Sequence, residues 1–424
     1  MNNFDSIVGY EAEKKELKRL CDVMKNPKKY LTLGAKMPKA ILLEGEPGLG
    51  KTLMAKTLIA ESGRSCFACK KDRADANFVD KIRETFELAS NNQPSIVFLD
   101  DMDKFAQDNL REDSNKEEFV VIQSCLEDIK DKDIFVIATA NDSYIIPASL
   151  LREGRFGKRL IISTPKKEDS LKIIKHFLKD KNLEDDVTPE FIANFVEDKS
   201  CAYLEACINE AALYSGFENK TKISRKNIID AIMYFMSKSQ PSNNISKEEK
   251  LKICFHEAGH AVASLLKGKK VALLSARRYG SLGGFCSTFD YEKTHSYEEF
   301  RNEISILLAG KAGVEIFFNT VDLGVKNDIS EAVELIKHHL QELAMEGFNY
   351  VYLEHKYHEK QSRKRFEEVI DKTSEILEEI YKETVSLLKK NAILLETIAK
   401  TLNEKEILVW DEILNIVEKE KVVL

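Results

Sequence analysis

The sequence predicts a multidomain α/β plus α fold, and three observations support this prediction. Up to about residue 165, short apolar runs alternate with helix-like stretches of about 10 to 20 residues, which is typical of a parallel sheet wound with helices. From 166 to 236, apolar residues recur at the three-and-four spacing of amphipathic helices. After a polar segment, residues 251–424 combine one Gly-rich, strand-like stretch with helices nearly to the end.

The strands of the first domain are expected at four apolar runs, "AILLEG", "SIVFLDD", "DIFVIATA" and "RLIIST". We take residues 1–165 as this α/β domain and residues 166–236 as a small all-helical domain. Residues 237–250, "SKSQPSNNISKEEK", are polar and lack periodicity, so we expect a linker there. The last domain, 251–424, is predicted to be mostly α-helical.

The composition is that of an ordinary globular protein. Of 424 residues, 43% are hydrophobic, and 64 Lys and Arg are scattered among 71 Asp and Glu. With a net charge of -7 and no large basic field, nucleic acid is not an expected partner. No apolar run reaches the roughly 18 residues that span a bilayer, so we expect a soluble, cytoplasmic chain without a membrane span. The eight cysteines favour reduced, mostly buried thiols.

The stretch "GEPGLGKT", residues 45–52, predicts a phosphate-binding loop. It follows the apolar run "AILLE" and leads into the helical stretch "LMAKTLIAES", which is the strand, loop and helix context that such a loop requires. Backbone amides can surround phosphate oxygens, Lys51 adds positive charge, and the Thr52 hydroxyl can hold Mg²⁺. The predicted nucleotide-binding residues here are Gly45, Glu46, Pro47, Gly48, Leu49, Gly50, Lys51, Thr52 and Leu53.

Polar residues after two later strands extend this predicted site. "SIVFLDD" ends in Asp100, expected to hold Mg²⁺, and Asp101, expected to orient the attacking water. "IATAND" brings Asn141, which can position water near the terminal phosphate. Arg152 and Arg155 lie on a loop from which they could reach a nucleotide bound by a neighbouring subunit. An arginine taken alone is more often an ordinary surface charge.

The stretch "HEAGH", residues 256–260, predicts a zinc-dependent peptidase site. Residues four apart share one face of a helix, so His256 and His260 can reach the same zinc ion while Glu257 accepts a proton from water. The alternative is a helix with two core or surface histidines. The surrounding apolar residues would bury one side of this helix, which supports the metal interpretation.

A catalytic zinc site also needs a third protein ligand. Downstream carboxylates offer three candidates, Glu315, Asp322 and Asp328. Asp328 begins a predicted helix in "KNDISEAVELIK", but composition alone does not choose it over Glu315.

Taken together and in this order, the motifs resemble the FtsH family of AAA+ zinc metalloproteases. The likeness runs from about residue 4 to about residue 418, and it includes "FDSIVGYEAEKKELKRL", "INEAAL", "LLAGKAGVEIFF" and "KNDISEA". It implies an AAA+ P-loop α/β domain with a small helical lid, followed by a zinc metallopeptidase domain. The implied cofactors are Zn²⁺, ATP and Mg²⁺, and the implied assembly is a homohexameric ring that draws protein substrates toward a peptidase chamber.

The same resemblance implies roles for individual residues. Val8 and Gly9 match the part of the family that packs on adenine, and "GSLGGF", 280–285, matches the segment beside which substrate adds as a strand. The other implied roles are a base, Glu257; zinc ligands, His256, His260 and Asp328; arginine fingers, Arg152 and Arg155; and a first sensor, Asn141.

Four features depart from the family pattern. The family has two transmembrane helices before the ATPase domain, and none precedes Met1, so we expect either a divergent, soluble member, which a membrane-bound relative or adaptor could recruit, or a chain from which these helices were removed. Asp101 stands where the family has Glu, one methylene longer. The aromatic pore residue is missing near 74–76, although Phe78 is close, and "KSCAYLEA" replaces the family's turn at the lid.

Two functional hypotheses follow. The first is an ATP-dependent zinc endopeptidase that acts on unfolded or loosely folded proteins, with the AAA+ ring controlling or driving substrate entry. The alternative is a nucleotide-regulated scaffold or chaperone-like ring with weak or no threading and an ATP-independent peptidase.

Overall fold

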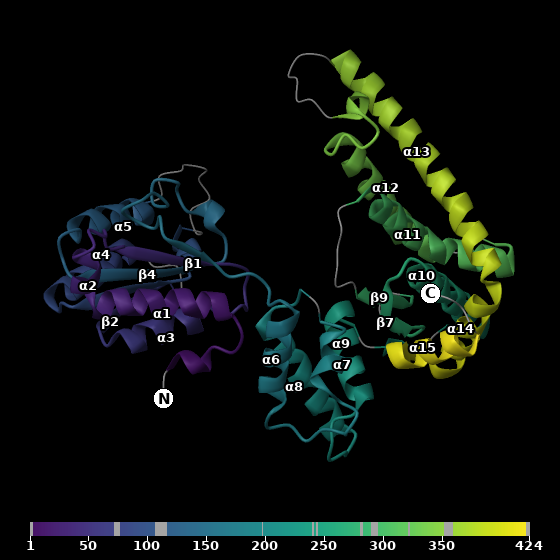
Figure 1. Cartoon of the computed structure of the whole chain (residues 1–424), viewed down its shortest axis with the longest axis horizontal. Helices are drawn as coiled ribbons and strands as arrows, with labels where there is room; N and C mark the ends of the chain where they lie inside the picture. The colour runs from purple at the N-terminus through teal and green to yellow at the C-terminus, as the bar shows by residue number, and fades with distance from the viewer. Residues whose placement is uncertain are drawn as a thin grey trace. The chain divides into compact units, whose positions relative to one another are not determined.

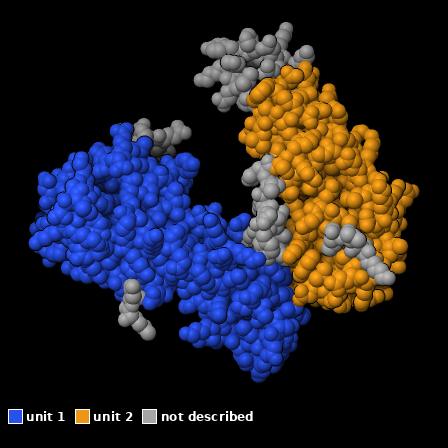
Figure 2. Space-filling view, viewed as in Figure 1, with its two compact units in different colours: residues 1–228 blue, residues 229–424 orange. Residues whose placement is uncertain are grey.

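The computed structural model describes residues 3–71, 77–106, 117–196, 198–239, 241–242, 245–279, 283–289, 296–320, 323–351 and 359–420. The chain forms two compact units, residues 1–228 and 229–424 (Figure 2). The boundary between them falls inside a helix, α9 (Arg225–Ser237).

A parallel five-stranded sheet forms the centre of the first unit, in the order β2-β3-β4-β1-β5. Its strands are β1 (Ala40–Glu44), β2 (Ser65–Lys70), β3 (Ser95–Asp100), β4 (Ile134–Ala140) and β5 (Arg159–Ile161). The α/β prediction is confirmed, and four of the strands are the four expected apolar runs. The strand β2 was missed because only Cys69 of "SCFACK" is fully buried, so the segment shows no apolar run.

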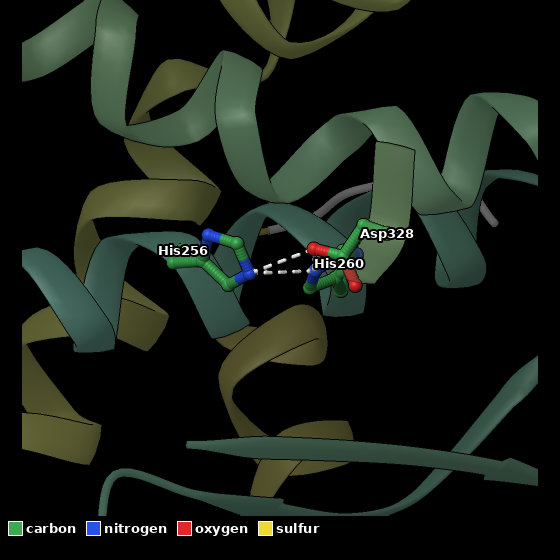
Figure 3. Close-up of side chains that lie close together, drawn as sticks. All are labelled: His256, His260 and Asp328. Carbon is green, nitrogen blue, oxygen red and sulfur yellow. Dashed lines mark hydrogen bonds and ion pairs between the residues drawn. The ribbon is translucent and has the colours of Figure 1, made fainter. Parts of the chain in front are cut away.

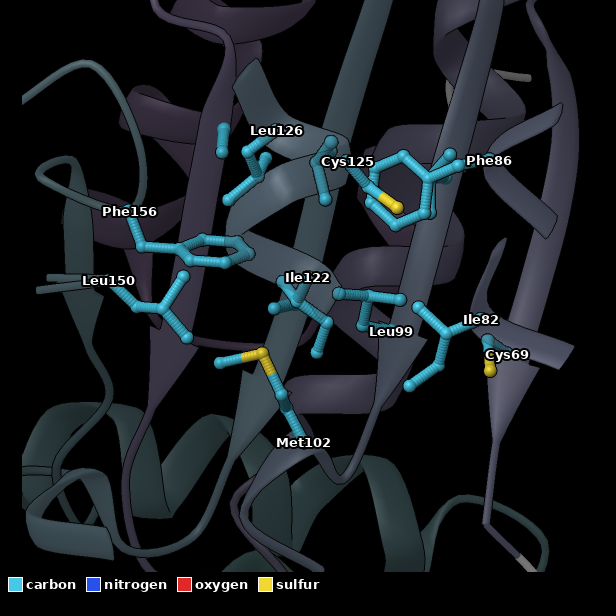
Figure 4. Packing of buried hydrophobic residues seen from close by; sticks show 14 of the residues in the cluster. Cys69, Ile82, Phe86, Leu99, Met102, Ile122, Cys125, Leu126, Leu150 and Phe156 are labelled. Atoms are coloured by element: carbon cyan, nitrogen blue, oxygen red, sulfur yellow. The ribbon is translucent and has the colours of Figure 1, made fainter. Parts of the chain in front are cut away.

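Helices cover both faces of this sheet (Figure 1). Because side chains alternate across a strand, Leu42 and Leu99 face one side of the sheet and belong to one buried cluster with Ile82 and Ile122. Figure 4 shows Leu99 packed with Ile82 and Ile122 in this cluster. This side is covered by α4 (Phe78–Asn91) and α5 (Glu117–Asp128). The other side is covered by α1 (Glu11–Lys25) and α3 (Lys51–Ser62), and a short α2 (Pro27–Leu31) follows α1.

The rest of the first unit is helical, as predicted. After β5 come α6 (Lys167–Leu178), α7 (Pro189–Ala193) and α8 (Cys201–Phe217), and then α9. Ser200 caps α8, since its hydroxyl accepts a hydrogen bond from the backbone N–H of Tyr203 at 3.3 Å. The N–H of Ala202 donates to the carbonyl of Gly48 at 3.0 Å. The start of α8 therefore touches the loop between β1 and α3.

The second unit is mostly helical. Its helices are α10 (Lys247–Leu266), α11 (Tyr297–Phe318), α12 (Lys326–Gln341), α13 (Glu359–Lys390), α14 (Ala392–Lys405) and α15 (Trp410–Lys419). An antiparallel sheet has the order β10-β7-β9, with β7 (Lys270–Ser275), β9 (Phe285–Phe289) and β10 (Ile407–Val409). A second, two-stranded sheet pairs β6 (Pro241–Ser242) with β8 (Arg278–Tyr279).

The segment expected to be a linker is partly ordered into these elements. Residues 241–242 form β6, and α10 begins at Lys247, three residues before the expected end of the linker. Ser246 caps α10 by accepting a hydrogen bond from the N–H of Glu249 at 3.1 Å. This cap explains why the helix begins inside a stretch that looks polar and aperiodic.

Two helices of the second unit, α10 and α11, approach each other closely because glycines lie at their contact. A Cβ added at Gly259 would overlap the carbonyl of Ala309, and one added at Gly313 would lie 2.6 Å from the carbonyl oxygen of Phe255. The helix α12 packs beside α11 and α13 in a cluster that includes Ile304. Among the described residues, none of the helices is both long and apolar enough to cross a membrane.

Candidate metal and nucleotide sites

Three side chains of the second unit converge on one point (Figure 3). His256 and His260 come from α10, and Asp328 comes from the first turn of α12. Their candidate ligand atoms all lie within 4.8 Å of one another. Both histidines are buried at 8% exposure, so the cluster is largely shielded from solvent.

The spacing of these atoms fits a zinc ion. Oδ2 of Asp328 lies 3.1 Å from Nε2 of His256 and 3.4 Å from Nε2 of His260, and the two Nε2 atoms are 3.0 Å apart. Tetrahedral zinc, with bonds near 2.0 Å, holds its ligand atoms about 3.3 Å apart. Oδ2 of Asp328 is buried and has no donor in hydrogen-bond geometry. Two imidazoles and one carboxylate are also a donor set that zinc accepts.

The second nitrogen of one imidazole is fixed by the protein. Nδ1 of His260 lies 2.7 Å from the backbone carbonyl of Ile306 in α11, which orients the ring so that Nε2 points at the cluster. Burial opposes the charged form of Asp328, but the imidazoles of His256 and His260, whose Nε2 atoms lie 3.1 and 3.4 Å from Oδ2, hold its pKa below the usual range. Asp328 is therefore ionised, as a metal ligand must be.

The packing of α12 brings one of the three candidate carboxylates to the histidines. Asp328 joins the histidines, whereas Glu315 bonds instead to Lys311 at 2.7 Å and accepts a hydrogen bond from Tyr381. Asp322 lies outside the described residues.

Glu257 lies beside this cluster in a cleft of about 1060 Å³. The opposite wall includes Gly284 and Phe285, at the start of β9. A Cβ at Gly284 would lie 2.8 Å from Cγ of Glu257, so the backbone there passes directly over the carboxylate. Burial raises the pKa of Glu257, which brings it closer to that of a general base working near neutral pH.

In the first unit, the loop between β1 and α3 forms a candidate phosphate site. Gly48 and Gly50 have φ angles of 81° and 89°, which glycine adopts without strain. Nζ of Lys51 donates to the carbonyls of Gly45 and Glu46 and to Oδ1 of Asn141, all within 2.8 Å. The ends of β1 and β4 are thus joined through Lys51.

The residues expected to hold Mg²⁺ lie together. The Thr52 hydroxyl donates to Oδ1 of Asp100 at 3.0 Å, and the Thr139 hydroxyl donates to the same oxygen at 2.9 Å. Burial opposes ionisation of Asp100, but hydrogen bonds from Thr139, Lys70 and Thr52 keep its pKa below the usual range. A hydroxyl and an ionised carboxylate side by side are suited to a hard cation.

Asp101 has a φ of 57°, and its N–H donates to the Thr139 hydroxyl at 2.8 Å. Its carboxylate pairs with Lys104 at 2.9 Å and with Lys70 at 3.7 Å. Sequence reasoning missed both lysines, and it also missed Asp103, whose Oδ1 accepts from the N–H of Asn141 at 3.2 Å. The signal that could have found Lys70 is its position at the end of β2, but that strand was itself missed.

The remaining predicted residues differ in burial and in their contacts. Val8 and Gly9 lie between the first helical turn and α1, and a Cβ at Gly9 would lie 3.0 Å from Cβ of Asp169. Arg152 is exposed. Arg155 donates to Glu127 at 3.1 Å and to the carbonyl of Ser149 at 2.6 Å, so it is held within its own chain. Glu46, Pro47 and Leu53 are exposed on the loop and on α3, whereas Leu49 is buried.

Comparisons with known proteins match two families to this chain. Residues 41–164 match the ATPase family associated with various cellular activities (AAA), and residues 243–416 match Peptidase family M41. An ATP-dependent zinc metalloprotease FtsH from Ruminiclostridium cellulolyticum is 30% identical over 95% of this chain and 70% of its own length. This chain belongs to the FtsH family.

Other FtsH proteins are longer than this chain. The FtsH of Streptobacillus moniliformis is 31% identical over 97% of this chain but only 63% of its own length. The FtsH of Leptotrichia buccalis is 30% identical over 99% of this chain and 57% of its own length. The chain therefore spans about six tenths of the length of these two FtsH relatives.

Of the departures from the FtsH pattern, the altered lid turn lies in the part of the chain that the structure describes, and the pore segment does not. The pore segment 74–76 lies outside the described residues, as do residues 280–282 of the expected substrate segment. The altered turn "KSCAYLEA" is described, and its Ser200 and Ala202 pack on Gly48, where a Cβ would lie 2.8 Å from that of Ala202. The changed lid turn thus still contacts the loop that is expected to hold phosphate.

Proposed function

We propose that this chain is an ATP-dependent zinc endopeptidase of the FtsH type, which hydrolyses peptide bonds in unfolded or loosely folded proteins. The convergence of His256, His260 and Asp328 in one cleft with Glu257 carries this proposal. Membership of the FtsH family supports it.

The chemistry of the peptidase follows from the positions of these residues. When bound, zinc would act as a Lewis acid on the scissile carbonyl and lower the pKa of water. Glu257 would accept a proton from the attacking water and pass it to the leaving amine. The buried position of Glu257 favours this role, because burial raises its pKa and a carboxylate with a raised pKa is a stronger base.

The strand β9 suggests how a peptide is held. It pairs only with β7 among the described strands, so its other edge can accept hydrogen bonds from an extended chain. Gly284 and Phe285 line the cleft beside Glu257. We assign this edge to substrate main chain, a mode of binding that tolerates many sequences.

The nucleotide site would control or drive substrate entry. In this proposal, the loop from Gly45 to Leu53 binds ATP phosphates, Thr52 and Asp100 hold Mg²⁺, Asp101 orients water and Asn141 senses the terminal phosphate. Val8 and Gly9 would contact adenine. Arg152 and Arg155 would act on the nucleotide of a neighbouring subunit in a homohexamer.

A second candidate function is favoured by the lysines beside Asp101. Pairing with Lys104 and Lys70 restrains this carboxylate, which is already one methylene shorter than the Glu of the family. A ring in which hydrolysis is slow would act as a nucleotide-regulated scaffold with an ATP-independent peptidase. In that case nucleotide would control access to the cleft without threading.

One experiment separates the two functions. A stably folded protein and an unfolded casein are each incubated with the chain and zinc, in the presence of ATP, a non-hydrolysable analogue or no nucleotide. The endopeptidase with active threading predicts that the folded substrate is cleaved only with ATP. Equal cleavage of the folded substrate with the analogue would refute threading, and no cleavage of casein under any condition would refute the peptidase.

A further inference from the structure

Lys70 lies at the end of β2, directly beside Asp100 at the end of β3. In the parallel pairing of these strands, Lys70 and Asp100 are register partners. Nζ of Lys70 lies 3.2 Å from Oδ2 of Asp100 and 3.7 Å from Oδ2 of Asp101. Because the sheet register places the two backbones side by side, the Lys70 side chain begins within reach of both carboxylates.

The two oxygens of Asp100 have different partners. Oδ1 accepts the hydroxyl hydrogens of Thr52 and Thr139, whereas Oδ2 accepts from Lys70. Asp100 is only 5% exposed, so its charge needs a nearby cation. Lys70 therefore neutralises the same carboxylate that is expected to hold Mg²⁺.

Among the described residues, the ion-paired charges at this part of the site balance one another without a divalent cation. Three carboxylates and three ammonium groups of these residues lie around the ends of β1, β2, β3 and β4; they are Asp100, Asp101, Asp103, Lys51, Lys70 and Lys104. In phosphate-binding loops generally, Mg²⁺ supplies the positive charge next to the loop hydroxyl and the strand carboxylate. Here an ammonium group already contacts that carboxylate.

We propose that Lys70 is a resident cation of the nucleotide site and makes nucleotide binding only weakly dependent on Mg²⁺. Without Mg²⁺, its ammonium group keeps Asp100 from repelling the phosphates. With Mg²⁺, repulsion between the ammonium group of Lys70 and the metal weakens the binding of Mg²⁺. Both effects reduce the difference in nucleotide affinity between the two conditions. The inference rests on the proposed binding of ATP at this loop.

The test measures binding, so it does not depend on hydrolysis. The dissociation constant of a fluorescent ADP analogue is measured by anisotropy for the full chain in excess EDTA and in Mg²⁺, and the ratio of the two constants is compared between variants. In Lys70→Met, the ratio of the constant in EDTA to that in Mg²⁺ should rise by about tenfold, because unit charges about 5 Å apart near a protein surface interact by more than 1 kcal/mol. Lys70→Arg keeps the charge and should keep the wild-type ratio.

Lys104→Met is the matched control, since it removes the same charge from the same cluster, but Lys104 contacts Asp101 and not Asp100. In Lys104→Met, the logarithm of the ratio of the dissociation constant in EDTA to that in Mg²⁺ should change by less than half as much as in Lys70→Met. An unchanged ratio in Lys70→Met, or an equal change in Lys104→Met, would overturn the assignment of Lys70. If the wild-type chain binds no nucleotide even in Mg²⁺, the proposed ATP site fails instead. Melting temperatures within a few degrees of wild type establish that each variant is folded.

Discussion

Gly310 of α11 packs directly against the imidazole of His260 on α10. A Cβ at Gly310 would lie 2.6 Å from Cε1 of His256 and closer still to Nε2 of His260. Both rings therefore occupy space that any other residue at position 310 would fill. The metal cluster depends on this glycine as well as on its ligands.

Replacing this glycine should displace the ligands. We expect Gly310→Ala to weaken zinc binding at least tenfold and to destabilise the fold by about 1–3 kcal/mol, because a packed site has no room for an added methyl group. Zinc competition with a chromogenic chelator and thermal unfolding measure the two effects. Gly216→Ala is the control, since a Cβ there meets nothing within 4 Å. Wild-type zinc affinity in Gly310→Ala would contradict the close packing.

Removing the proposed base should separate metal binding from catalysis. Glu257→Gln keeps the shape of the side chain but cannot accept a proton, so we expect cleavage of unfolded casein to fall by about 10²- to 10⁴-fold. Zinc content, measured by atomic absorption, should stay at the wild-type level. Undiminished casein cleavage in this variant would rule out Glu257 as the base.

The third ligand can be tested with a pair of carboxylate variants. Asp328→Asn should lower zinc affinity strongly, since a neutral amide is a poor zinc ligand. Glu315→Gln should bind zinc as wild type does, because Glu315 is bonded to Lys311 and Tyr381 and not to the histidines. If Glu315→Gln weakened zinc binding more than Asp328→Asn does, Asp328 would not be the third ligand.

Zinc should stabilise the second unit against heat. A ligand that binds only the folded state adds about 2.7 kcal/mol when its concentration is 100 times its dissociation constant. We expect calorimetry to show that zinc raises, and a chelator lowers, the melting temperature of the wild-type chain. His260→Ala should show neither change. A melting temperature of wild type that zinc does not alter would contradict a metal site in the folded state.

Complementation tests the proposed assembly. Asp101→Asn should bind nucleotide but not hydrolyse it. Rings of Arg152→Ala should also not hydrolyse ATP, because each nucleotide site then lacks the arginine finger of the neighbouring subunit. In a ring, a 1:1 mixture of the two variants should recover roughly a quarter of the wild-type ATPase rate, since one interface in four then carries both residues. If Arg152→Ala alone hydrolyses ATP at the wild-type rate, Arg152 does not act at the nucleotide site.

Patterns within short stretches of the sequence predicted most of the fold and most of the candidate site residues. The apolar runs of β1, β3 and β4 were recognisable because these parallel strands are buried and have few polar positions, whereas the short run of β5 is mostly exposed. The half-exposed β2 lacks such a run, and β10 is only three residues long, so neither has a distinct pattern. The expected linker extended too far, into α10, because a helix cap depends on one side chain, Ser246, and not on periodicity.

The sequence by itself determined the features that lie within a few residues of each other. The spacing of His256 and His260 on one helical face follows from 3.6 residues per turn, and the loop that ends at Lys51 follows from three closely spaced glycines between a strand and a helix. Only the tertiary structure decided that Asp328, and not Glu315, lies with the two histidines, and that Lys70 lies against Asp100. These pairs depend on the packing of α12 beside α11 and on the register of β2 with β3. Such contacts join distant parts of the chain, and periodicity within each part does not encode them.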